Sequence, residues 1–271
     1  MGKKLFLLIK ILLAFISLLG VFLFKFGVFN ISQKFLDIFF NICVGVFSSM
    51  ILVFFIDEIS RHIQERKSLQ DELEYIRRFN IVISLYIERY KTMFYCVTTP
   101  LDKRNFKEIS MPEKFSLKEM IDLHENTLLT NDGFFDSSVD AFMKIELMIR
   151  NEMISLVERY DFTHYPQFVN LFINFIQLSI IYDCRAAISE NNVRIKNNYS
   201  FRDTLRSVLL NNADDYYLKM KCGEMVPSNI VNPYIFLYEM MNEQRKIILE
   251  YQSLIEKILN ETNTKKNNKK Q

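Results

Sequence analysis

FLDIFFNICVGVFSSMILVFFI, residues 35–56, decides how this chain is built. The stretch contains one charged side chain, Asp37, close to its N-terminal end. A helix needs about 20 residues to cross the ~30 Å hydrocarbon core of a bilayer, so the stretch predicts a membrane span. Toward the N-terminus, residues 5–24 (LFLLIKILLAFISLLGVFLF) form a second apolar run with Lys10 as its single charge. The sequence therefore predicts a hairpin of two transmembrane helices within residues 1–56.

The basic residues around the two runs predict their orientation. Lys3 and Lys4 precede the first run, whereas the loop between the runs carries only Lys25 and Lys34. The flank of the second run is richer in basic side chains: Arg61, Arg66, Lys67, Arg77 and Arg78. By the positive-inside rule we expect a multi-pass membrane protein with both termini in the cytoplasm. The first run is long and lacks a small-residue cleavage site, so it is interpreted as an uncleaved anchor with Lys10 reaching toward the N-terminal side.

The segment that follows the second run continues a helical pattern. No Gly or Pro occurs between Asp57 and Thr99, and Pro100 is the first helix breaker. Apolar side chains recur mostly at steps of three and four, as on a helix with one buried face: Leu73, Ile76, Ile83, Ile87, Tyr90, Phe94 and Val97. We expect residues 57–99 to form a stalk helix of coiled-coil type, either continuous with the span or kinked near residues 57–60.

The remaining residues predict an all-α cytoplasmic bundle over 100–260. Ser116 and Glu119 form a capping-box pattern that opens a short helix ending near residue 126, and Asn131 to Gly133 mark a turn. Longer helices are expected over 137–160, 166–190, 201–222 and from 232 onward. The helix from 166 is the most apolar and is expected at the centre of the core. The tail 261–271 lacks apolar residues, carries four lysines and is expected to be disordered.

Composition and motifs argue against several function classes. Residues 57–264 hold 25 basic and 31 acidic side chains, so direct binding of nucleic acid is not expected. No glycine-rich phosphate loop and no nucleophile elbow occurs. The four cysteines are isolated from one another and are typical of a reducing compartment. We therefore expect a protein that is not an enzyme and that has no catalytic residue, metal site or cofactor.

Two groups that include histidine are interpreted structurally. Asp122, His124 and Glu125 are near neighbours on a short helix and point in different directions, so they are interpreted as solvated surface. His164 follows Asp161 at a helix end and is interpreted as a loop histidine with a capping role.

Small and polar residues interrupt both apolar runs at helical spacing. They are Asn41, Gly45, Ser48 and Ser49 in the second run, and Ala14, Ser17 and Gly20 in the first. Small residues let helices approach closely in a bilayer, and Asn or Ser side chains hydrogen-bond between them. These two ridges either pack the hairpin together or pack between protomers of a homo-oligomer, around a path that Asn41 and Asp37 would face.

A stripe of three amides lies on the apolar helix predicted from residue 166. Asn170, Asn174 and Gln177 follow helical spacing. A buried amide needs a partner, so the stripe is either an internal hydrogen-bond ladder, a solvent-exposed strip, or a docking face for a partner protein.

This layout resembles the two-span membrane effectors that accompany retron reverse transcriptases in bacterial phage defence. The resemblance is one of architecture over the whole chain, and no residue role is transferred by it. It implies a toxin-like effector that a cytosolic protein or ribonucleoprotein partner holds inactive, and that perturbs the inner membrane when released. The alternative, from another class, is a non-catalytic membrane scaffold that recruits a cytosolic protein.

Overall fold

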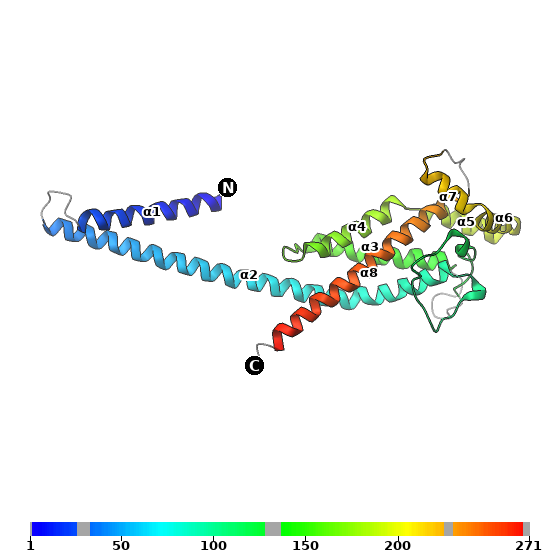
Figure 1. Cartoon of the computed structure of the whole chain (residues 1–271), viewed down its shortest axis with the longest axis horizontal. Helices are drawn as coiled ribbons and strands as arrows, with labels where there is room; N and C mark the ends of the chain where they lie inside the picture. The colour runs from blue at the N-terminus through cyan, green and yellow to red at the C-terminus, as the bar shows by residue number, and fades with distance from the viewer. Residues whose placement is uncertain (1, 26–32, 128–136, 225–229, 268–271) are drawn as a thin grey trace. The chain divides into compact units, whose positions relative to one another are not determined.

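The computed structural model describes residues 2–25, 33–127, 137–224 and 230–267 (Figure 1). Over these residues the chain is helical and contains no strand, which confirms the all-α class. The helices are α1 (Gly2–Lys25), α2 (Gln33–Thr98), α3 (Ser138–Arg159), α4 (Pro166–Ile181), α5 (Arg185–Asn197), α6 (Tyr199–Asn211), α7 (Ala213–Lys221) and α8 (Asn232–Asn267), with short 3₁₀ helices η1 (Leu101–Lys103) and η2 (Leu117–Met120). The turn predicted at Asn131 to Gly133 lies outside the described residues.

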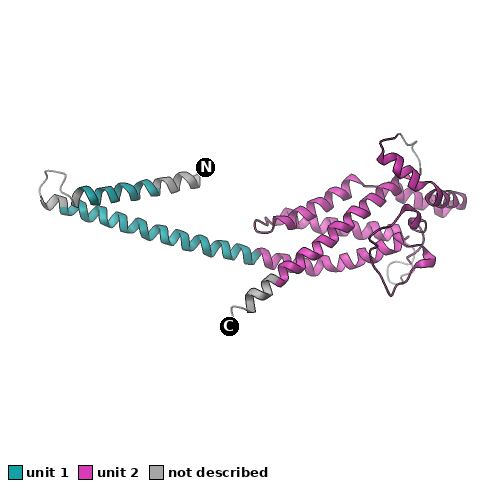
Figure 2. Cartoon of the chain, in the orientation of Figure 1, with its two compact units in different colours: residues 1–71 teal, residues 72–271 magenta. Residues whose placement is uncertain are grey.

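The chain divides into two compact units, residues 1–71 and 72–271 (Figure 2). Unit 1 contains α1 and the first part of α2. Among the described residues, α2 is the one helix that is by itself long and apolar enough to cross a membrane, and its most apolar window has a mean hydropathy of 2.4. The described side chains of α1, over Lys10–Leu23, are mostly apolar as well. No glycine or proline kink interrupts α2, which is a single helix of 66 residues.

Unit 2 is a helical bundle built on the last part of α2. The apolar positions that the sequence predicts on this part of α2 are buried, except that Leu73 is half-buried, and Ile76, Ile83, Tyr90 and Phe94 are fully inaccessible to solvent. α3 and α8 contribute their own apolar faces to the same core. Burying a side chain of this size stabilises the fold by roughly 1.5 to 3 kcal/mol, so this face alone fixes how α2 packs in the bundle.

The α4 helix is not the central helix that its composition predicts. Phe168, Phe172 and Phe175 are fully buried, but Ile180 and Ile181 on the other face are 60% and 68% exposed. The prediction from apolar content that this helix lies at the centre of the core was therefore wrong. Its phenylalanine side chains occupy core positions, whereas Ile180 and Ile181 lie on the surface.

Two long helices predicted from the sequence are each broken in the structure. α4 ends at Ile181 and α5 begins at Arg185 with a bend of 49°, where one helix over 166–190 was predicted. At the break, the Asp183 carboxylate accepts the Arg185 main-chain N–H (3.2 Å). Likewise α6 and α7 replace one helix over 201–222, and the α6 cap is Asn198, whose side chain accepts the Phe201 N–H (3.2 Å).

The start of the helix predicted over 137–160 and the end of the helix predicted over 201–222 agree with the structure, whereas two other predicted ends do not. The Ser137 hydroxyl caps α3 by accepting the Asp140 N–H (3.2 Å). Gly223 follows α7 with a φ of 74°, a left-handed conformation that favours glycine. The Ser116–Glu119 capping box is present, but it opens only η2, because the Leu123 N–H bonds back to the Met120 carbonyl in 3₁₀ fashion (3.2 Å). α8 extends to Asn267, so the helix continues through seven residues of the predicted tail, as elongation of an existing helix costs little.

Candidate functional site: an exposed face of α2

The small and polar residues of α2 form one exposed face of unit 1. Asn41, Gly45 and Ser49 follow one another at steps of four, and Ser48 lies beside them, so all four project from one side of the helix. Each is exposed, and a Cβ atom added at Gly45 would meet no atom within 4 Å. We call these four residues the α2 small face.

The opposite side of this part of α2 is partly covered. Its half-buried residues recur at steps of three and four: Phe40, Cys43, Phe47, Met50 and Phe54. The other helix of unit 1 in the described part of the chain is α1. We infer that α1 packs on this phenylalanine-rich side and leaves the α2 small face free.

The small residues of α1 have a different environment. Ser17 is buried, with 5% of its surface exposed, and its hydroxyl donates to the Ala14 carbonyl (2.9 Å). Ala14 and Gly20 are half-buried. The two ridges predicted from the sequence are therefore not equivalent within one chain, because the α1 ridge is covered and the α2 small face is not.

An ion pair joins the two helices of unit 1. The Lys10 ammonium of α1 donates to the Asp57 carboxylate at the end of the apolar run of α2. The Lys10 side chain is only 15% exposed, so this cation is largely removed from solvent. We expected Lys10 to reach toward the N-terminal side alone; the structure gives it a carboxylate partner, which lowers the cost of a charge among apolar side chains.

The predicted amide stripe of α4 lies on the surface of unit 2. Asn170, Asn174 and Gln177 are all exposed, so they do not form an internal ladder. Ile173 lies between them and is 37% exposed. No residue of α4 is charged. The stripe is thus part of a neutral, partly apolar surface.

A buried polar cluster around His124 is a feature that the sequence did not predict. The His124 ring bonds to the Asn192 side chain through Nδ1 and to the Tyr234 hydroxyl through Nε2 (2.7 Å). The Asn192 amide also donates to the Asp140 carboxylate (2.6 Å). Burial lowers the pKa of His124 from 6.5 to about 4. The interpretation of His124 and Asp122 as solvated surface was wrong: Asp122 is 4% exposed and accepts the Leu101 N–H (3.0 Å).

A second buried cluster surrounds Glu146. Its carboxylate is fully buried, receives the Arg185 guanidinium and accepts the Gln244 amide (2.8 Å). Gln244 in turn accepts the Tyr90 hydroxyl (3.1 Å). The members of this cluster come from α2, α3, α5 and α8, so the cluster links these four helices. No local sequence pattern predicts it, because its members are far apart in sequence.

His164 lies in the loop between α3 and α4, as predicted, but it caps neither helix, because Tyr165 is the N-cap of α4 and has no side-chain cap. The Glu72 carboxylate accepts the His164 main-chain N–H (3.0 Å) and the Thr163 hydroxyl (2.9 Å), and bonds the His164 ring (2.7 Å). Burial raises the pKa of Glu72, but these hydrogen bonds outweigh burial and the pKa is lowered overall.

The chemistry of these clusters is that of structural polar contacts. The residues that the structure describes contain no group of three or more His, Cys, Asp or Glu side chains that could hold a metal ion. Comparison with known proteins gives no further assignment, since no family model, no curated protein and no solved structure matches the chain.

Proposed function

We propose that this protein is an effector of the bacterial inner membrane in a retron-type antiviral defence system. Residues 1–56 cross the membrane as a two-span hairpin with both termini in the cytoplasm. Copies of the chain associate through the α2 small face, and the assembly perturbs the membrane when a cytosolic protein or ribonucleoprotein partner releases it.

The surface of unit 1 supports the membrane location. Leu52, Phe55 and Ile56 are 62%, 65% and 54% exposed, and none of the most apolar window of α2 is buried. Exposing one such side chain to water forfeits roughly 1.5 to 3 kcal/mol. A bilayer removes this cost for the whole apolar run.

The Lys10–Asp57 ion pair supports the hairpin topology. Lys10 lies in the first part of α1, and Asp57 lies where the apolar run of α2 gives way to charged residues. A contact between the first part of α1 and the end of the apolar run is what two antiparallel spans would make. In such a hairpin the N-terminus and the end of the second span lie on the same side of the membrane.

The observation that carries the proposal is the exposure of the α2 small face on the side away from the half-buried phenylalanines. A lipid tail gains little from Asn, Gly and Ser, whereas a second helix gains close backbone approach and hydrogen bonds of about 0.6 to 2 kcal/mol each. Asn41, Gly45 and Ser49 have the four-residue spacing typical of such contacts.

The test is to induce the chain in bacteria and follow the membrane potential with a potential-sensitive dye, with and without phage infection. We expect depolarisation and growth arrest, and we expect Gly45→Leu to relieve both because the added side chain separates the helices. Val44→Leu and Val46→Leu add the same side chain at the two flanking positions, which lie off the face, and should stay active. Normal growth and polarisation of the unmodified chain, both alone and after infection, would refute the proposal.

A membrane scaffold is the second candidate, and the exposed neutral surface of α4 favours it. Ile180 and Ile181 are exposed beside the Asn170, Asn174 and Gln177 stripe, as on a surface that a protein partner covers. A scaffold needs its spans only as an anchor. Exchanging residues 1–56 for an unrelated two-span hairpin should then preserve function, and loss of function on this exchange would contradict the scaffold.

A further inference from the structure

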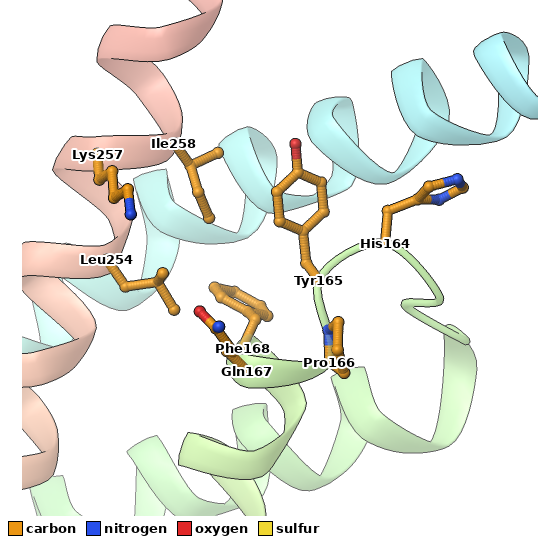
Figure 3. Close-up of a pocket in the computed structure, with 8 residues that line it drawn as sticks. All are labelled: His164, Tyr165, Pro166, Gln167, Phe168, Leu254, Lys257 and Ile258. Atoms are coloured by element: carbon orange, nitrogen blue, oxygen red, sulfur yellow. The ribbon is translucent and has the colours of Figure 1, made fainter.

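A pocket of 340 Å³ lies between the start of α4 and the last turns of α8 (Figure 3). Its floor is apolar: Phe168 is fully buried, Ile258 is 5% exposed and Leu254 is half-buried. Its rim is polar, with Lys257 on α8 and Gln167 on α4. Figure 3 shows both side chains directed into the space between the two helices, while the His164 ring points away from it.

The polar groups at this rim lack partners in the part of the chain that the structure describes. Lys257 has no carboxylate within ion-pair distance there, and the Gln167 side chain makes no hydrogen bond there. The neighbouring carboxylate of Glu72 is already hydrogen-bonded to Thr163 and His164. A cation and an amide therefore stand above an apolar floor without a counterion.

The α4 N-terminus adds to the positive character of the rim. Tyr165 occupies the N-cap position without a side-chain cap, and the first turn contains no acidic residue. Pro166 has no N–H, and the Phe168 N–H bonds back to the Tyr165 carbonyl (3.1 Å). The Gln167 N–H has no acceptor among the described residues, so it remains available to an anion at the positive end of the helix.

We propose that this pocket binds an anionic amphiphile, that is, a phosphate monoester or carboxylate with a short apolar chain. The anionic group contacts the Lys257 ammonium and the Gln167 N–H, and the chain covers Phe168, Leu254 and Ile258. The pocket volume is at the lower end of the range for ligand sites, about 300 to 1,000 Å³, which favours a short chain. This proposal is independent of membrane damage by the protein.

The test is calorimetric titration of hexyl phosphate into the full-length chain in phosphatidylcholine nanodiscs, with empty nanodiscs as the blank. We expect saturable binding with one site per chain, and a Kd raised at least about tenfold in Lys257→Met, since a charge-assisted contact is lost. Lys246→Met removes an exposed lysine of the same helix that pairs with Glu243 and should leave the Kd unchanged. Inorganic phosphate and hexanol should each bind at least about tenfold more weakly than hexyl phosphate.

Three results would overturn the proposal: no saturable binding above the blank, an unchanged Kd in Lys257→Met, or equal binding of hexyltrimethylammonium. The source of the ligand is a separate measurement. Nanodiscs that contain phosphatidylglycerol should raise the apparent Kd of hexyl phosphate if a bilayer lipid fills the pocket, and leave it unchanged if the ligand is soluble. Either result supports the anionic amphiphile site.

Discussion

His124 is held neutral by its surroundings, and this couples its protonation to folding. Burial lowers its pKa from 6.5 to about 4, and the hydrogen bond with Asn192 and the charge of Asp140 offset only part of the effect. Between these two pH values the unfolded chain binds a proton that the folded chain does not. The folded state therefore loses stability as the pH falls through this window, by about 3 kcal/mol at pH 4.

We predict that His124→Gln flattens the pH dependence of unfolding between pH 6.5 and 4, although it also loses ring contacts and starts from a lower stability. Denaturant unfolding of the full-length chain followed by circular dichroism measures this slope. An equal slope in His124→Gln and the unmodified chain would contradict the buried neutral ring.

Replacing Glu146 is expected to lower the free energy of unfolding. Its fully buried carboxylate receives the Arg185 guanidinium, so Glu146→Leu leaves this largely buried cation with Asp183, a more exposed carboxylate, as its remaining ion-pair partner. We predict a loss of about 3 to 5 kcal/mol in the free energy of unfolding, and a smaller loss in the double variant Glu146→Leu/Arg185→Leu. Glu190→Gln breaks an exposed pair with Arg194 and should cost about 0.5 kcal/mol. A double variant that is less stable than Glu146→Leu would contradict this account.

At the scale of the element, the ion pair between α1 and α2 is the contact to test. Asp57→Leu removes the carboxylate that pairs with Lys10, whereas Lys10→Leu/Asp57→Leu removes both charges of the pair. We predict that the single variant is destabilised and that the double variant recovers, with a coupling energy of about 1 to 2 kcal/mol. The free energy of unfolding is measured with sodium dodecyl sulfate in mixed micelles. The unmodified chain, Lys10→Leu, Asp57→Leu and the double variant form the double-mutant cycle. A coupling energy of zero would mean that the pair does not hold α1 to α2.

The elements also separate what the sequence could predict from what it could not. The long α2, the Ser137 cap of α3 and the Gly223 stop follow from apolar periodicity, capping chemistry and backbone conformation, which are local properties. The break after Ile181 has no Gly or Pro to mark it. The contact beside the break joins Arg185 to Glu146, which are 39 positions apart in sequence, so no local pattern predicts it. The sequence spacing predicted the small and polar residues on one side of α1 and of α2. Which of these two sides is buried depends on how the two helices pack, which the spacing does not determine.

The buried polar clusters could not be predicted from local sequence either. His124 meets partners 68 and 110 positions later in the chain, Asn192 and Tyr234, and no local spacing encodes that meeting. Apolar content likewise placed α4 at the centre of the core, although it is buried on one face only. Local chemistry thus predicts the helices and their caps, whereas the clusters that fix the bundle arise from contacts that only the fold brings together.

At the scale of the whole molecule, the continuity of α2 links the proposed spans to unit 2 through one helix. Residues 57–71 are almost entirely exposed, so the helix itself is the connection along this stretch. If a partner bound to unit 2 controls the membrane segment, the signal passes through this helix, and a helix break should uncouple the two. Proline inside a helix costs about 3 kcal/mol and removes a main-chain hydrogen bond.

We predict that Glu65→Gly/Arg66→Pro abolishes the response of the membrane potential to phage infection and leaves the thermal unfolding of unit 2 unchanged. Glu65→Ala/Arg66→Ala removes the same side chains, keeps the helix and should retain the response. The Arg61–Glu65 pair is lost in both variants, so the comparison isolates the backbone. A normal response in the Gly-Pro variant would show that α2 does not carry the signal from unit 2 to the membrane segment.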